Sequence, residues 1–206
     1  MKNILLIGGM GSGKTTLADA LVNENPDMNY IYMSKYAVRI PMSLIASTQP
    51  NLLSLPKPEY IKTVFENKDI RLVDFSRQNL DYFANMISEA YGETFIAELA
   101  LSAIMPDKQN IVDNVPKVAN VSYLKDKGLY IVSLHCKPET QLQRRLKAQK
   151  DIDHSDESDL KRQIEQTNRF FEVEAIRGLA DVIYDTDDIR IEDYAIVARR
   201  IIQVTQ

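Results

Sequence analysis

The stretch NILLIGGMGSGKTTLADAL, residues 3–21, begins with a short apolar run and continues into a glycine-rich segment. An apolar run that ends in glycines, as at 3–7, is typical of a strand buried on both faces of a parallel sheet. After Lys14, apolar residues recur at the spacing of a helix. The stretch therefore predicts a strand, a tight loop and a helix in direct succession.

The loop carries a phosphate-binding motif, because Gly8, Gly13, Lys14 and Thr15 match G-x-x-x-x-G-K-[ST]. Glycines let the backbone curl so that successive N–H groups point at phosphate oxygens, and the following helix adds the positive end of its dipole. The residues expected to bind the donor phosphates are Gly9, Gly11, Ser12, Gly13, Lys14, Thr15 and Thr16. A glycine-rich turn that binds nothing is the alternative, but packing alone would not select the Gly-Lys-Thr triplet.

The rest of the chain alternates between strand and helix patterns. Further strands are predicted at 29–33, 110–115, 129–135 and 181–185, a loop at 48–59 and a long polar helix at 157–177. Five strands alternating with helices indicate an α/β fold with a parallel sheet covered on both faces. Together with the phosphate-binding motif, this predicts the three-layer P-loop NTPase fold. The mostly helical stretch at 35–104 forms an insertion between the second and third strands.

Bulk composition narrows the class of protein. The 206 residues, 45% of them hydrophobic, suffice for one well-buried core rather than two full domains. A net charge of −4 argues against a duplex-binding surface. A single cysteine, Cys136, and the lack of a secretory or membrane-spanning apolar run favour a soluble cytoplasmic protein without membrane contact.

Asp113 is the next candidate site residue. It ends an apolar run at the carboxyl end of a predicted strand, which is the edge of a parallel sheet where ligands bind. Its carboxylate would hold Mg²⁺ through water or accept a proton from an acceptor hydroxyl. The alternative is a capping aspartate for a helix that starts near Pro116.

The sequence lacks the signature motifs of several other classes of P-loop protein. The chain has no D-x-x-G, the order of residues in NKDI (67–70) is wrong for guanine recognition, and no transporter-type L-S-G-G-Q-like motif is present. The length is also short for a ring ATPase with an extra helical domain. A compact P-loop kinase is the class that remains.

Three segments carry a resemblance to the P-loop nucleotide kinases: the P-loop, IVDNVPKVANVSYLKDKGLYIVSLHCKPETQLQRR (111–145) and SDESDLKRQIEQ…GLADVIYDTDDIR (155–190). The chain is similar to nucleoside monophosphate kinases, dephospho-CoA kinases and their archaeal kinase-like relatives. The resemblance implies ATP and Mg²⁺ as cofactors, with Lys14 on the β- and γ-phosphates and Thr15 and Asp113 at the metal. It also implies one kinase domain, with a core at 1–34, 105–143 and 178–206, an acceptor-binding insertion at about 35–104 and a lid at about 144–162.

Arginines complete the set of candidates that the resemblance implies. Arg144 and Arg145 lie near the lid arginines of the family and are expected to clamp the transferring phosphate, and Arg162 and Arg169 are further candidates of this kind. Arg39 and Arg77 are expected to bind the acceptor, although MSKYAVR (33–39) lacks the aspartate that the family usually places before this arginine. For each arginine the alternative is a solvated surface position.

These observations predict an ATP-dependent kinase of a nucleotide-like small molecule: a nucleoside or deoxynucleoside monophosphate, or dephospho-CoA. Two alternatives stay open, a regulatory nucleotide-binding module without a small-molecule acceptor and a kinase of polynucleotide ends. The acidic net charge speaks against the second. The sequence does not decide the oligomeric state.

Overall fold

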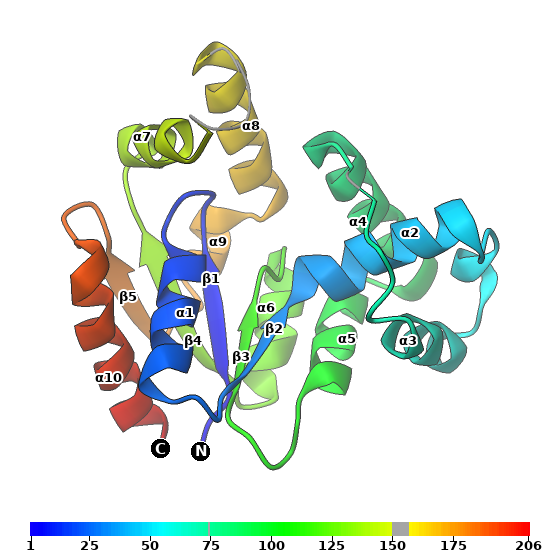
Figure 1. Cartoon of the computed structure of the whole chain (residues 1–206), viewed down its shortest axis with the longest axis horizontal. Coiled ribbons are helices and arrows are strands. Elements are labelled where there is room, and N and C mark those ends of the chain that lie inside the picture. Colours follow the sequence, from blue (N-terminus) through cyan, green and yellow to red (C-terminus); the bar gives the residue numbers. More distant parts are fainter. Residues whose placement is uncertain (74, 150–156) are drawn as a thin grey trace.

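A computed structural model describes residues 1–73, 75–149 and 157–206, apart from the side chains of Arg77 and Gln149. Five parallel strands form one sheet in the order β2-β3-β1-β4-β5 (Figure 1). They are β1 (Ile4–Gly8), β2 (Asn29–Tyr32), β3 (Asn110–Asp113), β4 (Tyr130–His135) and β5 (Val182–Asp185). All five predicted strands are present, and the predicted α/β fold is confirmed.

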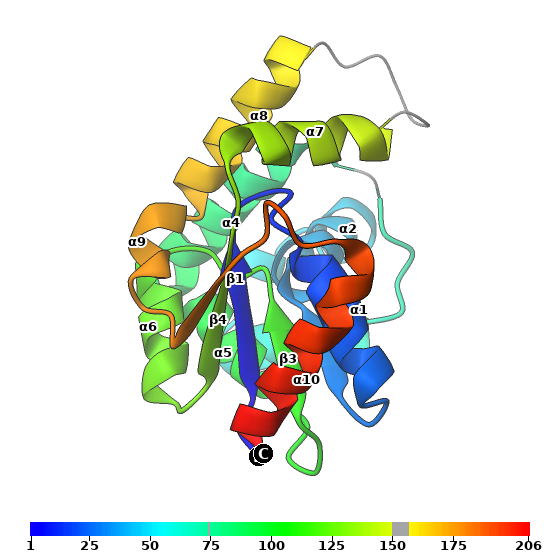
Figure 2. The same ribbon diagram turned by 90° about the vertical axis from the view of Figure 1, so that its left-hand side faces the viewer.

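Helices cover both faces of the sheet (Figure 2). The helices outside the insertion are α1 (Lys14–Glu24), α6 (Val118–Asp126), α7 (Pro138–Gln149), α8 (Glu157–Phe170), α9 (Val173–Arg177) and α10 (Tyr194–Thr205), the last preceded by the 3₁₀ turn η3 (Ile191–Asp193). Side chains alternate along β1: Ile4 and Leu6 pack with α1 and α10, whereas Leu5 and Ile7 pack with the helices of the other face. All five residues of β1 are buried, as expected for a central parallel strand.

Between β2 and β3 the chain forms a set of helices that lies beside the sheet (Figure 1). They are the π-helical turn η1 (Lys35–Arg39), α2 (Ile40–Ser47), the 3₁₀ turn η2 (Leu52–Ser54), α3 (Lys57–Glu66), α4 (Arg77–Tyr91) and α5 (Phe95–Ala103). The prediction of a loop at 48–59 is wrong in part, because η2 and the start of α3 lie within it. Pro58 lies in the first turn of α3, where a missing N–H removes no helical hydrogen bond.

The prediction of one helix at 157–177 is also wrong. The chain turns between α8 and α9 at Glu172, whose φ is 53°. The Glu172 carboxylate accepts a 2.8 Å hydrogen bond from the backbone N–H of Val118 at the start of α6, and Phe171 is buried in the turn. This long-range contact stabilises the break between α8 and α9, and no local sequence pattern predicts the break.

Strand register places the functional groups. Leu6 of β1 lies opposite Asp113 of β3, and Gly8 lies opposite Leu134 of β4. The carboxyl ends of β1 and β3 therefore meet, so that the loop after β1 and the last residue of β3 face one site. Helices α7 and α8 lie above this edge of the sheet (Figure 2). Within the described part of the chain, no helix has both the length and the apolar character needed to cross a membrane.

Candidate active site

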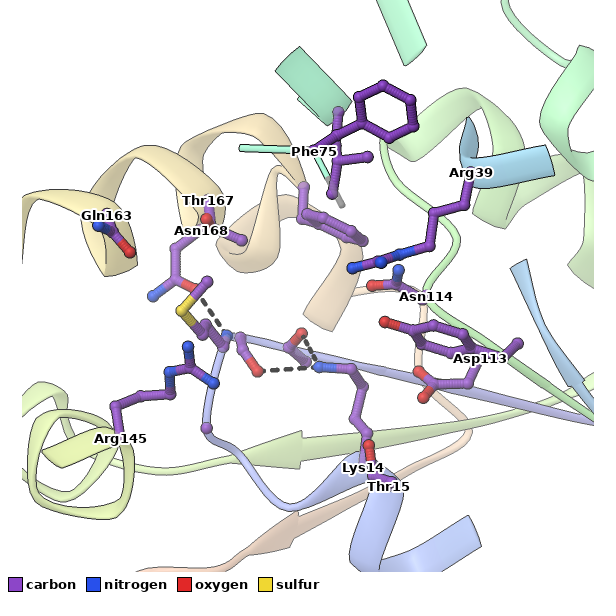
Figure 3. A pocket seen from close by; sticks show the side chains of 17 residues that line it. Lys14, Thr15, Arg39, Phe75, Asp113, Asn114, Arg145, Gln163, Thr167 and Asn168 are labelled. Atoms are coloured by element: carbon purple, nitrogen blue, oxygen red, sulfur yellow. Dashed lines mark hydrogen bonds between the residues drawn. The ribbon is translucent and has the colours of Figure 1, made fainter. Parts of the chain in front are cut away.

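The loop between β1 and α1 has the conformation that its glycines allow. Gly11 and Gly13 have φ values of 76° and 96°, in the left-handed region that residues with a side chain rarely adopt. Gly13 also lies directly beneath the Tyr194 hydroxyl, with no room for a Cβ atom. The Lys14 ammonium bends back into the loop and donates 2.9 Å hydrogen bonds to the carbonyl oxygens of Gly8 and Gly9 (Figure 3).

Asp113 lies beside this loop at the end of β3 with only 1% of its surface exposed. The Tyr30 hydroxyl donates a 3.1 Å hydrogen bond to Oδ2 of Asp113. The other carboxylate oxygen, Oδ1, is buried and meets no hydrogen-bond partner among the described residues. Burial raises the pKa of Asp113, and the nearby Lys14 charge, the Tyr30 hydroxyl and the Asn114 backbone N–H oppose that rise. A buried carboxylate with an unsatisfied oxygen fits a site that is completed by a bound ligand.

A cavity of about 360 Å³ joins the loop and Asp113 to distant parts of the chain. Of the predicted site residues, its wall includes Gly9, Gly11, Lys14, Thr15, Arg39, Asp113 and Arg145. Arg39 and Arg145 approach the cavity from different sides, Arg39 from the end of η1 and Arg145 from α7 (Figure 3). Nε of Arg145 is buried without a hydrogen-bond partner among the described residues. The cavity thus brings together cations that lie more than a hundred residues apart in sequence.

The remaining predicted residues lie elsewhere. Ser12 is buried within the loop, and neither Gly13 nor Thr16 lines the cavity. The Arg77 side chain lies outside the described part of the structure. Arg162 is exposed and pairs with Asp159 at 2.6 Å, and Arg169 lines a separate pocket behind the loop.

Arg144 lies within hydrogen-bond distance of the phosphate loop but does not line the cavity. Its guanidinium donates to the Gly11 carbonyl at 3.2 Å, to Oγ1 of Thr186 at 3.0 Å and also to the Thr186 carbonyl oxygen. Oγ1 of Thr186 in turn donates to the Ser12 carbonyl at 3.0 Å. Arg144 therefore braces the phosphate loop against the segment after β5, and Arg145 is the arginine of this pair that faces the cavity.

The brace predicts a stability effect for Arg144→Ala. Loss of the guanidinium removes the donor to the Thr186 carbonyl and leaves the Gly11 carbonyl with only the Cys136 thiol. We therefore expect the free energy of unfolding to fall by about 1–3 kcal/mol. Thermal unfolding checks this, with a drop of roughly 2–4 °C for each kcal/mol in a chain of this size. The matched variant Arg199→Ala removes an exposed arginine that lies 3.8 Å from Glu24 and should leave the midpoint unchanged. Equal midpoints for the two variants would contradict the brace.

The cavity wall also includes residues that the sequence patterns do not predict as site residues. They are Met10, Tyr32, Phe75, Leu80, Asn114, Gln163, Thr167, Asn168 and Phe171. Asn114 follows Asp113 directly and has a φ of 68°, a backbone conformation that asparagine tolerates better than most residues. Gln163 and Thr167 are four residues apart on α8 and so share one face of the helix, which is the signal that the sequence offers for them.

The residues present fit ATP and Mg²⁺. The glycine loop, the helix start and Lys14 form an anion-binding cradle, and Thr15 lines the same cavity as Asp113. Among the described residues, no group of three or more His, Cys, Asp or Glu side chains could hold a metal ion by itself. A Mg²⁺ ion would therefore depend on phosphate oxygens as well as on Thr15 and Asp113, which is the usual arrangement for this ion.

Comparison with known proteins agrees with this geometry. A family model described as "AAA domain" matches residues 4–168, and the chain belongs to this family. No curated protein sequence matches the chain at a significant level.

Three of the solved structures with a similar fold carry the names of kinases. Shikimate kinase from Bacteroides thetaiotaomicron aligns with a TM-score of 0.52 and 17% identity, covering 98% of both chains. Gluconokinase from Sinorhizobium meliloti 1021 aligns with a TM-score of 0.52 and 16% identity, covering 99% of this chain and 93% of that one. Shikimate kinase from Acinetobacter baumannii in complex with shikimate gives a TM-score of 0.50 and 16% identity, covering 99% and 92%.

Fold, phosphate loop and family together define a P-loop protein whose fold is shared with solved kinases. The predicted resemblance to P-loop kinases is confirmed at the level of the fold, and the family supports the predicted use of ATP with Mg²⁺. The structural likenesses, at 16–17% identity, show the fold alone.

Proposed function

We propose that this protein transfers the γ-phosphoryl group of ATP to a nucleotide-like small molecule: a nucleoside or deoxynucleoside monophosphate, or dephospho-CoA. The observation that carries the proposal is the shared cavity, which Lys14 and Asp113 line together with Arg39 (Figure 3). Arg39 is a cation supplied by the insertion rather than by the donor loop. A cation there suits an anionic acceptor, because an arginine fork matches the geometry of phosphate and carboxylate.

The residues of the cavity divide the work of phosphoryl transfer, which consists mainly of positioning and of neutralising charge. Lys14 would stabilise charge on the β- and γ-phosphates, and Arg145 would neutralise the transferring group from the α7 side. Thr15 and Asp113 would hold the Mg²⁺ ion, which supplies charge neutralisation on the phosphate oxygens. Asp113 is alternatively the group that accepts the proton of the acceptor.

Aromatic side chains favour a nucleotide-like acceptor over a purely aliphatic one. Phe75, Phe171 and Tyr32 line the cavity along with Arg39. Such a wall offers ring faces for a planar base and one cation for a phosphate, and stacking of a base on an aromatic ring is worth roughly 1–3 kcal/mol. A cytoplasmic location, where ATP and Mg²⁺ are supplied, accords with this activity.

The test is ADP release from ATP·Mg²⁺ against a panel of acceptors. The panel contains nucleoside and deoxynucleoside monophosphates and dephospho-CoA, with shikimate and gluconate as the acceptors in the names of the structural neighbours, and an oligonucleotide. We expect the largest response from a nucleotide-like member. A response to shikimate or gluconate alone would replace the acceptor class, and a response to no acceptor would favour a nucleotide-binding module.

Arg39→Ala tests the acceptor side separately from the donor side. Loss of a charge-assisted contact should lower kcat/KM for the acceptor by roughly 10- to 100-fold and leave the KM for ATP within about twofold. The matched variant Arg71→Ala removes an exposed arginine of the insertion that does not line the cavity. A rise in the KM for ATP with an unchanged KM for the acceptor would assign Arg39 to the donor and contradict the proposal.

A further inference from the structure

The tip of the phosphate loop is hydrogen-bonded to a side chain of α8. The backbone N–H of Met10 donates to Oδ1 of Asn168 at 3.0 Å, 158 residues away in sequence. Nδ2 of Asn168 donates to Oε1 of Gln141 on α7 at 2.9 Å. Nε2 of Gln141 then donates to the Cys136 carbonyl at the end of β4 at 3.3 Å. We call this chain of contacts the amide bridge, and it links the loop tip, α8, α7 and the sheet.

The amide bridge accounts for a glycine that the phosphate motif does not require. Gly9 stands at a variable position of G-x-x-x-x-G-K-[ST], and its φ lies outside the left-handed region. A Cβ atom at Gly9 would lie 2.8 Å from Oδ1 of Asn168 and 2.9 Å from Nε2 of Gln141. A larger residue at this position would therefore displace one or both amides, which pack directly against the loop backbone.

The Met10 side chain makes the same connection through apolar contacts. It packs against the small cluster of Leu142, Leu160 and Ile164, which joins α7 to α8. Both the backbone and the side chain of this loop residue are therefore held by the two helices above the site. A displacement of α8 must move the loop tip with it or break these contacts.

Asn168 also borders the reaction cavity. It lines the cavity together with Gln163 and Thr167 of the same helix, opposite Lys14 (Figure 3). Asn168 thus connects α8 directly to the loop that would cradle the donor phosphates.

We propose that Asn168 is a positioning residue, which holds the Met10 peptide and couples the placement of α7 and α8 to donor binding. The inference rests on the proposed phosphotransfer and deepens it. With Asn168 in place, the loop tip is already ordered before ATP binds, so less ordering remains to be done on binding. Without it, the Met10 N–H loses its acceptor, and a small misplacement of reacting groups slows transfer strongly.

The test compares Asn168→Ala with the wild type by hydrogen exchange, ATP binding and turnover. In the nucleotide-free variant, the Met10 amide should exchange about tenfold faster, which is the fold-change expected for one lost hydrogen bond. The dissociation constant for a non-hydrolysable ATP analogue with Mg²⁺ should rise by about tenfold or more, and kcat should fall by a similar factor. The KM for the acceptor should stay within about twofold.

Two further variants sharpen the result. Asn168→Asp keeps an oxygen for the Met10 N–H, so it should restore slow exchange of that amide while weakening ATP binding through its added negative charge. Gln143→Ala removes an exposed amide of α7 and should match the wild type in every measurement. If Asn168→Ala does not fold, Asn168→Asp carries the test alone, with fast Met10 exchange or unchanged ATP binding as the contradicting results.

Each outcome decides the proposal. Wild-type Met10 exchange or wild-type ATP affinity in a folded Asn168→Ala protein would overturn the positioning role, as would an unchanged kcat beside faster exchange. Hydrogen exchange and analogue binding need no acceptor. They therefore report on Asn168 even if every acceptor fails and the proposed phosphotransfer is wrong.

Discussion

Lys14→Ala is expected to lower acceptor-dependent ADP release by at least about 100-fold, the effect of removing one preorganised group that stabilises transition-state charge. The Lys14 ammonium lies inside the phosphate loop, on the carbonyl oxygens of Gly8 and Gly9, and lines the cavity. Donor phosphates placed in the loop would meet this charge directly. Turnover measured at saturating ATP·Mg²⁺ separates this loss from weaker binding.

The fold should survive this change, because the Lys14 side chain lies at the cavity rather than in either apolar cluster that covers the sheet. Far-ultraviolet circular dichroism and the thermal midpoint are the checks. Lys127→Ala removes an exposed lysine at the end of α6 and serves as the control with wild-type turnover. A Lys14→Ala protein that turns over at the wild-type rate would sink the assignment of the active site.

Asp113→Asn is expected to lower turnover by about 100-fold or more and to raise stability at neutral pH. The rate effect follows from losing a carboxylate that serves the metal or the acceptor proton. The stability effect follows from burial: the Asp113 carboxyl is 1% exposed and its pKa is raised. An ionised carboxylate in this position costs folding free energy that a neutral amide of the same shape does not.

The sign of the pH dependence follows from proton linkage. In the unfolded chain, Asp113 releases its proton near its ordinary pKa of about 3.9. The folded protein holds that proton to higher pH, so the wild type loses stability as pH rises from about 4 through the raised pKa. The midpoint of Asp113→Asn minus that of the wild type should therefore grow between pH 4 and pH 7. A difference that shrinks over this range would contradict a destabilising buried carboxylate.

The sequence patterns were informative where structure is decided locally. The apolar run before Gly8 forms β1, and the spacing of Gly8, Gly13 and Lys14 forms the phosphate loop, because both depend on neighbouring residues. The position of Asp113 at the site follows from the rule that parallel strands present their carboxyl ends at one edge of the sheet. These features carry the donor half of the site.

Features that depend on packing between distant segments were not predictable in this way. Arg144 and Arg145 are adjacent in sequence, but consecutive residues of a helix point about 100° apart. Which of them faces the cavity depends on how α7 is rotated about its axis above the edge of the sheet, and no pattern within α7 predicts this rotation. The hydrogen bond of Glu172 with Val118, where α8 and α9 separate, and that of Asn168 with Met10 likewise join residues more than fifty positions apart.

The segment at 48–74 has a packing role where the structure describes it. Tyr60 of α3 is fully buried, with its ring centroid 4.9 Å from that of Tyr91 and 5.4 Å from that of Phe95. None of the described residues in this segment lines the cavity, and Phe75 is the next residue along the chain that does. The segment thus supports the insertion that carries Arg39.

Phosphorus NMR of the complete reaction tests the central claim most directly. The protein is incubated with ATP, Mg²⁺ and the acceptor that gives the largest ADP release, with Lys14→Ala as the blank. The proposed function predicts that resonances of ADP and of a phosphorylated acceptor grow together in equal amounts, and that neither grows in the blank. Formation of ADP with inorganic phosphate and no phosphorylated acceptor would contradict it, because the protein would then hydrolyse ATP rather than act as a kinase.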